Sequence, residues 1–412
     1  MRGLIAPFAI AVIAVSASWS GAFAAKETKP AAPTNAPFAY LYDVTSDATL
    51  YAAKADVPTP PASMATLMTL ELVFKALKEG RLSRDQTFRV TEDAWRRGGA
   101  PSRNSTMFAK LNSEVAVSDL LRGVIVQSGT DAAITLATGL AGSEASFVSL
   151  MNQRAKELGL SYSTFRNATG QPDPEQKMSA RDVARLATHI IATYPELYRI
   201  FSEPEFTWSK ITQRNRNPLL ADYQGADGLK TGYTEDSGFG LVGSAIRDGR
   251  RLIIVLNGLE TAKDRAEEAR KLLDWGFNAF EQRRLFEGDD AVAEARVFGG
   301  NAMHVPLVAQ RPVDLLAPKG DDARVVARVS YDGPVAAPVA KGQRIGTLRV
   351  WRGPMLTVET TVYAAQDVPV GDLTRRALDG ALELVSGVMG QFIDQVTGQN
   401  TGQVSGQTAE KT

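Results

Sequence analysis

The stretch PPASMATLMTLELVFKALKEG, residues 60–80, places Ser63 at the start of a run with helical periodicity, directly after two prolines. A serine on the first turn of a helix lies near unpaired backbone N–H groups and the positive end of the helix dipole. Both features favour developing negative charge. The same position also suits a helix-capping serine, which is the commoner role. Ser63 is therefore a candidate nucleophile that needs support from other motifs.

A second serine lies in QSGTDAAITLA, residues 127–137. Ser128 and the glycine after it predict a tight turn that leads into a helix. Ser128 can take part in catalysis, or it can cap that helix with Asp131 in the first helical turn. The segment alone leaves both roles open.

The segment ADGLKTGYT, residues 226–234, places Lys230, Thr231 and Gly232 immediately before a predicted β-hairpin. A lysine and a hydroxyl on an edge strand can bind a substrate carboxylate, and a glycine removes the side chain that would block its approach. A Lys-Thr-Gly sequence by itself is a weak signal, because any surface strand can contain it. Its position after the two serines makes it informative.

The three motifs, in the order Ser-x-x-x, Ser-x-x and Lys-Thr-Gly, resemble the signature of the penicillin-recognising serine enzymes. The flanking sequences are similar to the low-molecular-weight D-alanyl-D-alanine carboxypeptidases, and the similarity extends from about residue 37 to 285. The segments that carry it are PPASMATLMTLELVF, LLRGVIVQSGTDAA, NATGQPDP, MSARDVARLA, RNRNPLL and GADGLKTGYTE.

The resemblance implies a role for each motif. Ser63 would attack the peptide bond between two terminal D-alanines of a peptidoglycan pentapeptide stem and form an acyl-enzyme, and Ser128 would relay a proton to the leaving amine. The backbone N–H groups of Ser63 and Tyr233 would form the oxyanion hole. Penicillins and other β-lactams would enter the same site as ligands. The residues that the resemblance assigns to substrate binding are Lys230, Thr231, Gly232, Tyr233, Arg265 and Thr130.

The sequence departs from the family at the position of the general base. Family members carry Ser-x-x-Lys, whose amine lies one helical turn after the serine and can take its proton. Here that position is Thr66, and a threonine hydroxyl is no base near neutral pH. Lys75 and Lys78 lie 12 and 15 residues after Ser63, about 18 to 22 Å along a helix. Lys54 belongs to the preceding hairpin, so none of the three is an obvious substitute.

Two further positions differ from the family pattern. Thr130 replaces the asparagine of Ser-x-Asn, whose amide binds the substrate carbonyl, and Gln171 replaces a large apolar residue. We therefore hold two hypotheses, a strongly impaired carboxypeptidase or a homologue that binds stem peptides without cleaving them. An unrelated serine esterase is a distant third, because it leaves the Lys-Thr-Gly strand unexplained.

The N-terminus has the three parts of a secretory signal peptide: a basic start at Arg2, an apolar stretch over residues 4–15, and an Ala-Phe-Ala sequence ending at Ala24. We expect cleavage after Ala24 and a location in the periplasm or on the outer face of the inner membrane. An uncleaved membrane anchor is the alternative, which the Ala-x-Ala ending disfavours.

Composition excludes several classes of function. Lys and Arg total 46, as do Asp and Glu, and no long basic run is present, so nothing indicates a nucleic-acid partner. The chain has no cysteine and two distant histidines, His189 and His304, which gives poor support for a Ser-His-Asp triad or a zinc site. We interpret both histidines as structural and expect no metal or cofactor.

Periodicity predicts an α+β fold. Residues 38–44 and 48–53 predict one β-hairpin, and residues 239–247 and 251–258 predict another through Asp248-Gly249. This order of elements predicts a sheet closed by both ends of the domain around a helical lobe, which the resemblance identifies as the β-lactamase/transpeptidase-like fold. The segments with helical periodicity are 63–80, 117–141, 144–158, 178–195 and 262–285.

Beyond about residue 290, short alternating runs such as GTLRV (346–350) and TVETTV (357–362) predict a small all-β domain. An apolar stripe then predicts an amphipathic helix that either makes weak peripheral contact with a membrane or packs on the β domain. The stripe consists of Leu378, Leu382, Val385, Met389, Phe392 and Val396. The predicted organisation is a signal peptide (1–24), a spacer (25–37), a DD-peptidase-like domain (38–288), a β domain (289–366), the helix (371–396) and a disordered tail (397–412).

Overall fold

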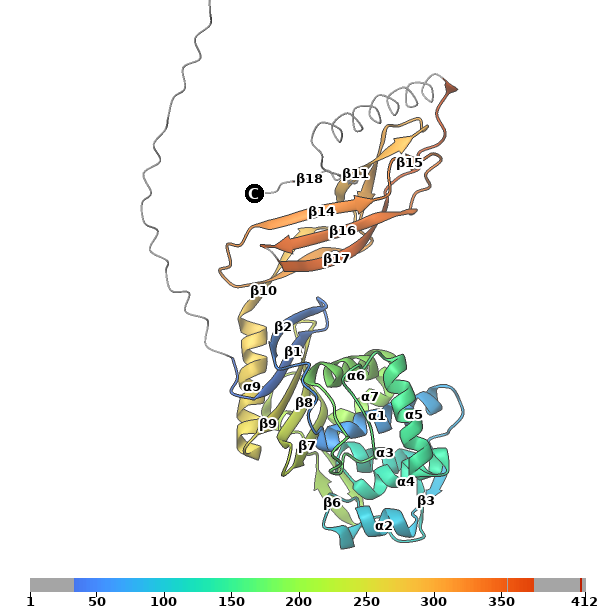
Figure 1. Ribbon diagram of the computed structural model, residues 1–412, viewed down its shortest axis with the longest axis vertical. Helices are drawn as coiled ribbons and strands as arrows, with labels where there is room; N and C mark the ends of the chain where they lie inside the picture. The colour runs from blue at the N-terminus through green and yellow to red at the C-terminus, as the bar shows by residue number, and fades with distance from the viewer. Residues whose placement is uncertain (1–32, 354, 374–407, 410–412) are drawn as a thin grey trace, which may run out of the picture. The chain divides into compact units, whose positions relative to one another are not determined.

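The computed structural model describes residues 33–353, 355–373 and 408–409 (Figure 1). The predicted signal peptide, most of the predicted spacer, and the predicted terminal helix and tail apart from residues 371–373 and 408–409 lie outside the described residues. The last residues of the predicted spacer belong to the fold. Thr34 is buried, and its hydroxyl donates to Glu268 at 2.7 Å. The folded chain therefore begins slightly before residue 38.

A five-stranded antiparallel sheet joins the two ends of the N-terminal part, residues 34–278. Its order is β2-β1-β9-β8-β7, so the first hairpin lies beside the strands that follow the helices (Figure 1). Both predicted hairpins and the turn at Asp248-Gly249 are confirmed. The strands are β1 (Phe38–Asp43), β2 (Ala48–Ala53), β7 (Ala226–Thr234), β8 (Gly238–Arg247) and β9 (Arg250–Leu259).

Helices cover both faces of this sheet (Figure 1). Successive side chains of a strand point to opposite faces. On β9, Ile253 and Val255 accordingly pack with the helical lobe, whereas Ile254 and Leu256 pack with α9. The helices are η1 (Ala62–Ala65), α1 (Thr66–Lys78), α2 (Glu92–Gly98), η2 (Ala100–Ser102), α3 (Val117–Ile125), α4 (Thr130–Ala141), α5 (Glu144–Glu157), α6 (Ala180–Thr193), α7 (Pro195–Tyr198), η3 (Arg199–Ser202), α8 (Leu219–Asp222) and α9 (Ala262–Asn278).

Two segments with helical periodicity are not single helices in the structure. The segment 117–141 contains α3 and α4, which are separated at the predicted Ser128-Gly129 turn, where Ser128 has a left-handed φ of 59° that no α-helix accepts. The segment 262–285 is helical only to Asn278, and Phe280–Phe286 forms strand β10, paired with β13 (Val313–Pro318). Tertiary pairing overrides local helical preference there.

Two further antiparallel pairs complete the helical lobe. These are β3 (Thr87–Arg89) with β4 (Glu114–Ala116), and β5 (Glu205–Trp208) with β6 (Ile211–Arg214). Within the described part of the chain, no single helix is long and apolar enough to cross a membrane. Helices α4 and α5 meet the length and composition only together, and they are bent by 86° at the break between them.

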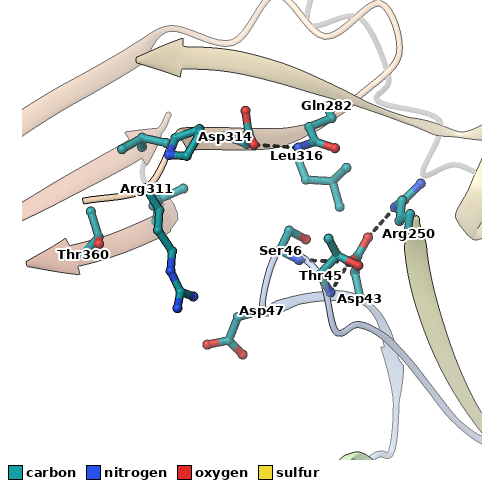
Figure 2. Close-up of a pocket in the computed structure, with 13 residues that line it drawn as sticks. Asp43, Thr45, Ser46, Asp47, Arg250, Gln282, Arg311, Asp314, Leu316 and Thr360 are labelled. Carbon is teal, nitrogen blue, oxygen red and sulfur yellow. Dashed lines mark hydrogen bonds and ion pairs between the residues drawn. The ribbon is translucent and has the colours of Figure 1, made fainter. Parts of the chain in front are cut away.

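Asp43 closes the β1–β2 hairpin (Figure 2). Its carboxylate accepts the backbone N–H groups of Thr45 and Ser46 at 2.9 and 3.0 Å and forms an ion pair with Arg250 of β9. Asp43 is fully buried, and a buried charge is tolerated when it is paired and hydrogen-bonded. The pair therefore ties the hairpin turn to the neighbouring strand and holds the register of β1 against β9.

The C-terminal part, residues 280–370, is built from strands around its own apolar core, as predicted. Gln282 of β10 donates to Asp314 of β13 at 2.7 Å (Figure 2). Thr408–Ala409, where the sequence predicts a disordered tail, pair with β14 as strand β18. The larger sheet has the order β15-β11-β12-β17-β16-β14-β18, with β11 (Ala291–Phe298), β12 (His304–Val308), β14 (Val325–Tyr331), β15 (Val335–Ala336), β16 (Arg344–Arg352) and β17 (Met355–Ala364).

Candidate active site

Ser63 lies on the short helix η1, which leads directly into α1. The segment before it is held by the sheet, because the Asn257 amide of β9 donates to Thr59 Oγ1 and to the carbonyl oxygen of Pro60, each at 3.1 Å. Ser63 is half-buried, whereas its neighbours Ala62 and Met64 are buried. The serine is thus fixed at a defined place beside the sheet.

Gly232 of β7 packs against the backbone of Ser63. A Cβ atom at position 232 would lie 3.2 Å from Ser63 N and 3.0 Å from Pro61 O. Any larger residue would push the strand away from the serine, so the close approach depends on glycine. The first and third sequence motifs therefore meet in one site.

Ser128 joins the second motif to the third. Lys230 Nζ donates to Ser128 Oγ at 2.6 Å and to the Thr231 carbonyl oxygen at 3.3 Å. Lys230 is only 1% exposed. The left-handed backbone of Ser128 costs about 1–2 kcal/mol for a residue with a Cβ, and such strain is concentrated at functional sites. The catalytic reading of Ser128 is thus better supported than the capping one.

Three cations meet around the Lys-Thr-Gly strand. Burial, and after it the positive charges of Arg216 and Arg265, lower the pKa of Lys230 to about 7. Burial, followed by repulsion from Arg216, also lowers the pKa of Arg265. The Arg265 Nε atom is buried with no hydrogen-bond partner among the described residues. An anionic ligand would relieve both the repulsion and the unpaired donor.

An aromatic pair contacts the cationic wall, which we define as Lys230, Arg216 and Arg265. Tyr233 is 51% exposed, and its ring stacks on Phe239 with a centroid separation of 4.2 Å. The Arg265 guanidinium lies 5.5 Å from the Phe239 centroid, within the range of a cation–π contact. Arg265 is thereby held close to the end of β7, where the resemblance places a carboxylate.

Thr130 begins α4, next to Ser128. Its backbone N–H donates to the Ser105 carbonyl oxygen at 2.8 Å. The buried carboxylate of Asp131 accepts from Thr106 Oγ1 at 2.7 Å and from the backbone N–H of Met107 at 2.9 Å. Burial raises the pKa of Asp131 even though these hydrogen bonds oppose the shift. Asp131 therefore fixes the Ser128 turn to the neighbouring segment.

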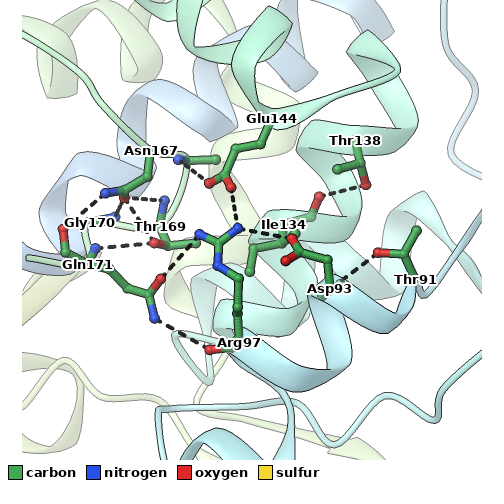
Figure 3. Close-up of polar contacts among 12 residues, drawn as sticks. Thr91, Asp93, Arg97, Ile134, Thr138, Glu144, Asn167, Thr169, Gly170 and Gln171 are labelled. Carbon is green, nitrogen blue, oxygen red and sulfur yellow. Dashed lines mark hydrogen bonds and ion pairs between the residues drawn. The ribbon is translucent and has the colours of Figure 1, made fainter.

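The loop 167–171 forms a further wall (Figure 3). The Asn167 Oδ1 atom accepts the backbone N–H groups of Thr169 and Gly170 at 3.2 and 2.8 Å. Gly170 has a φ of +82°, and a Cβ atom there would lie 2.9 Å from Ser63 Cα and overlap the Ala62 carbonyl group. The loop thus presses its backbone against the nucleophile, which requires glycine at this position.

Arg97 of α2 connects this loop to the helical lobe (Figure 3). Its guanidinium pairs with Glu144 at 2.6 Å, and Glu144 accepts the backbone N–H of Ala168 at 3.0 Å. The Gln171 side chain donates to the Arg97 carbonyl oxygen at 3.4 Å. The polar residue at position 171, where the family pattern expects an apolar one, therefore has partners in this structure.

His189 of α6 lies in a charged cluster. Its Nε2 atom lies 3.4 Å from the Glu71 carboxylate, which also pairs with Arg154 at 2.6 Å. Burial lowers the pKa of His189. Among the described residues, no group of three or more acidic or histidine side chains is arranged to hold a metal ion. The contacts of His189 are those of a structural residue.

Comparison with known proteins decides the family. Residues 24–261 match the family described as D-alanyl-D-alanine carboxypeptidase, and residues 280–370 match the penicillin-binding protein 5 C-terminal domain. The chain belongs to the D-alanyl-D-alanine carboxypeptidase family. It is 42% identical over 309 residues to the D-alanyl-D-alanine carboxypeptidase DacA of Haemophilus influenzae, covering 74% of this chain and 78% of that one.

Two solved structures of this carboxypeptidase fold are similar to the chain. Penicillin-binding protein 5 from Haemophilus influenzae has a TM-score of 0.72 and 39% identity, covering 82% of this chain and 98% of that one. Penicillin-binding protein D2 from Listeria monocytogenes, solved in its ampicillin-bound form, has a TM-score of 0.52 and 32% identity, covering 60% and 98%. The fold predicted from the motifs is confirmed.

Thr66 stands where the carboxypeptidase motif has its lysine. Its hydroxyl donates to the Ser63 carbonyl oxygen at 2.7 Å, and the residue is 4% exposed. The hydroxyl thus bonds the preceding helical turn, as threonine often does. It supplies no amine beside the serine, so this position cannot perform the acid–base step of the family mechanism.

The other lysines considered from the sequence are engaged elsewhere. Lys75 Nζ pairs with Glu79 at 2.6 Å, and Lys78 Nζ donates to the Thr193 carbonyl oxygen at 3.2 Å, both toward the far end of α1 from Ser63. Lys54 Nζ lies 5.6 Å from the centroid of a phenylalanine ring, that of Phe38. None of the three replaces the missing lysine.

Sequence reasoning missed Arg216. The segment RNRNPLL resembles the family, but the sequence alone does not show that Arg216 acts on Lys230 and Arg265. An arginine in a segment that resembles an enzyme family and lies just before the Lys-Thr-Gly strand is the signal that could have identified it.

Proposed function

We propose that this chain binds the D-alanyl-D-alanine ends of peptidoglycan stem peptides and acylates slowly at Ser63. The observation that supports the proposal is the cationic wall beside the serine. Lys230 is buried and Arg265 is half-buried, the Arg265 Nε atom has no hydrogen-bond partner among the described residues, and Thr231 adds a hydroxyl on the Lys230 strand. A terminal carboxylate fits these groups, and it would place the preceding peptide bond near Ser63.

The chemistry proposed for the site is acyl transfer. Ser63 Oγ attacks the carbonyl carbon, the backbone N–H groups of Ser63 and Tyr233 stabilise the oxyanion, and D-alanine leaves. Water then hydrolyses the acyl-enzyme. Loss of a general base typically lowers such a rate by about 10²- to 10⁴-fold. β-Lactams would bind the same groups, as ampicillin binds the related protein from Listeria monocytogenes.

Binding without turnover is the second candidate function. The observation in its favour is that the Thr66 hydroxyl donates its hydrogen bond to the Ser63 carbonyl oxygen and not to the Ser63 side chain. Labelling of the protein by a fluorescent penicillin separates the two candidates, with Ser63→Ala as the control. Labelling that requires Ser63 supports the slow enzyme. Peptide binding without labelling supports the non-catalytic homologue.

The carboxylate dependence of binding is a direct test of the cationic wall. A diacetyl-Lys-D-Ala-D-Ala peptide should bind at least about 10-fold more tightly than the same peptide with a C-terminal carboxamide, because a charge-assisted hydrogen bond contributes about 1.5–3 kcal/mol. Arg265→Gln should remove most of this difference. Calorimetry on both peptides measures it. Equal affinities for the acid and the amide would contradict carboxylate recognition.

We also propose that the chain is exported and attaches weakly to the outer face of the inner membrane through residues 371–396. The signal-peptide pattern and the apolar stripe described above support this. The mature protein should begin at Ala25 by mass spectrometry, and deletion of residues 371–412 should move it from the membrane to the soluble periplasmic fraction. Retention of Met1, or an unchanged distribution after the deletion, would contradict the respective half of this proposal.

A further inference from the structure

The Lys230 side chain points to the face of β7 that packs against Ser63. Side chains two residues apart on a strand point to one face, about 7 Å apart. Gly232 faces the Ser63 backbone, and a Cβ atom at Gly228 would meet the hydroxyl of Tyr198 in the helical lobe. Lys230 lies between the two glycines, so its side chain also points toward the helical lobe. It is two residues along the strand from Gly232, the residue that contacts Ser63.

Ser128 and Lys230 form a ready proton-transfer pair. The 2.6 Å bond between Lys230 Nζ and Ser128 Oγ is short enough for direct transfer. The charged groups that act on the amine are Arg216, which follows β6, and Arg265 of α9, and both are positive. Together with burial they favour the neutral amine, which can accept a proton near neutral pH.

We propose that Lys230, acting through Ser128, takes the proton of Ser63 and so performs the task of the lysine that Thr66 replaces, while Arg216 and Arg265 hold the carboxylate of the ligand. The inference rests on the proposed function. It assigns proton transfer to Lys230 and carboxylate binding to the two arginines of the cationic wall. Guanidinium groups remain charged at every relevant pH, so anion binding does not require a protonated Lys230.

The proposed step balances in atoms and charge. Ser63 Oγ forms a bond to the carbonyl carbon as its proton passes to Ser128 Oγ, and the Ser128 proton passes to the neutral Lys230 amine. The C–N bond of the peptide or lactam then breaks, and the leaving nitrogen receives the proton back from Lys230 through Ser128. No metal, oxidant or further reactant is needed.

The pH dependence of acylation tests this step on the unsubstituted protein. The first-order rate of acylation at saturating fluorescent penicillin should rise with pH, because deprotonation of Lys230 creates the base. The midpoint should lie near the Lys230 pKa of about 7, with a rate at pH 6 roughly 10-fold below the plateau. A flat profile between pH 5.5 and 8.5 would overturn the inference, and so would the complete absence of acylation.

Lys230→Arg separates charge from basicity. Arginine carries the charge of a protonated lysine but cannot accept a proton, so acylation should fall at least about 10²-fold, while affinity for the diacetyl-Lys-D-Ala-D-Ala peptide, held by Arg216 and Arg265, stays within about threefold. Ser128→Ala should also lower the rate and remove the midpoint near pH 7. An unchanged acylation rate in a folded Lys230→Arg protein would refute the role. Absence of peptide binding to the unsubstituted protein would instead refute the proposed function itself.

Discussion

Replacement of Thr66 by lysine, together with Thr130→Asn, is expected to raise D-alanine release from a D-Ala-D-Ala peptide at least about 10²-fold, the low end of what a positioned general base supplies. Residue 66 is the first of α1, one turn after Ser63, where its hydroxyl now bonds the Ser63 carbonyl oxygen. A lysine there would place an amine beside Ser63. Asparagine at position 130 would add an amide for the substrate carbonyl next to Ser128.

The controls separate basicity from side-chain volume. Thr66→Met brings a long side chain without an amine and should give no gain, although it meets the same buried surroundings as lysine. Ser63→Ala in the restored protein should abolish the gain. The two changes should be more than additive, because residues of one hydrogen-bonded unit couple strongly. A double variant that folds and gains nothing would show that the site has diverged beyond positions 66 and 130.

Restoration also reports on the role of Lys230. With an amine at position 66, the serine proton has a second acceptor, so acylation should become less sensitive to Lys230→Arg than in the unsubstituted protein. The measurement is the fold-loss of penicillin labelling caused by Lys230→Arg, taken at one pH in the restored and in the unsubstituted protein. The ratio of the two losses compares the lysine introduced at position 66 with Lys230 as the base. An equal loss in both backgrounds would mean that Lys230 contributes by binding alone.

The sequence predicted those features that depend on local pattern. The Ser63 helix, both hairpins and the Lys-Thr-Gly strand follow from periodicity and turn residues, and the structure confirms them. The Ser-Gly sequence predicted the turn between α3 and α4 at Ser128, but it predicted neither the left-handed backbone of Ser128 nor its contact with Lys230. Such a contact joins residues 102 positions apart and leaves no trace in a local window.

The features that the sequence did not predict depend on residues that are distant in the sequence but close in the folded structure. Arg216 acts on Lys230 and Arg265 only because the chain folds β6, β7 and α9 to one place. Gln171 looks irregular in the sequence, yet it contacts Arg97, which lies 74 residues earlier. The identity of the motifs can be read locally, whereas the electrostatic character of the site requires the folded structure.

Gly170→Ala is expected to disable the site and to destabilise the protein far more than Gly142→Ala. Both glycines have positive φ, +82° and +77°, so each substitution costs about 1–2 kcal/mol of backbone strain. Position 142, the C-cap of α4, has nothing within 4 Å of the added Cβ, whereas at position 170 the Cβ would overlap the Ala62 carbonyl group. Overpacking of this kind adds about 1–3 kcal/mol.

The loss of function should be larger than the loss of stability suggests. The added methyl group at position 170 must move either the 167–171 loop or η1, and it would lie 2.9 Å from the Cα atom of Ser63. A displacement of about 1 Å at a reacting group can lower a rate about 10²-fold. Penicillin labelling should therefore fall by about that factor in Gly170→Ala and stay unchanged in Gly142→Ala, with urea unfolding of both variants to measure stability. Equal labelling of two folded variants would mean that the loop does not position the nucleophile.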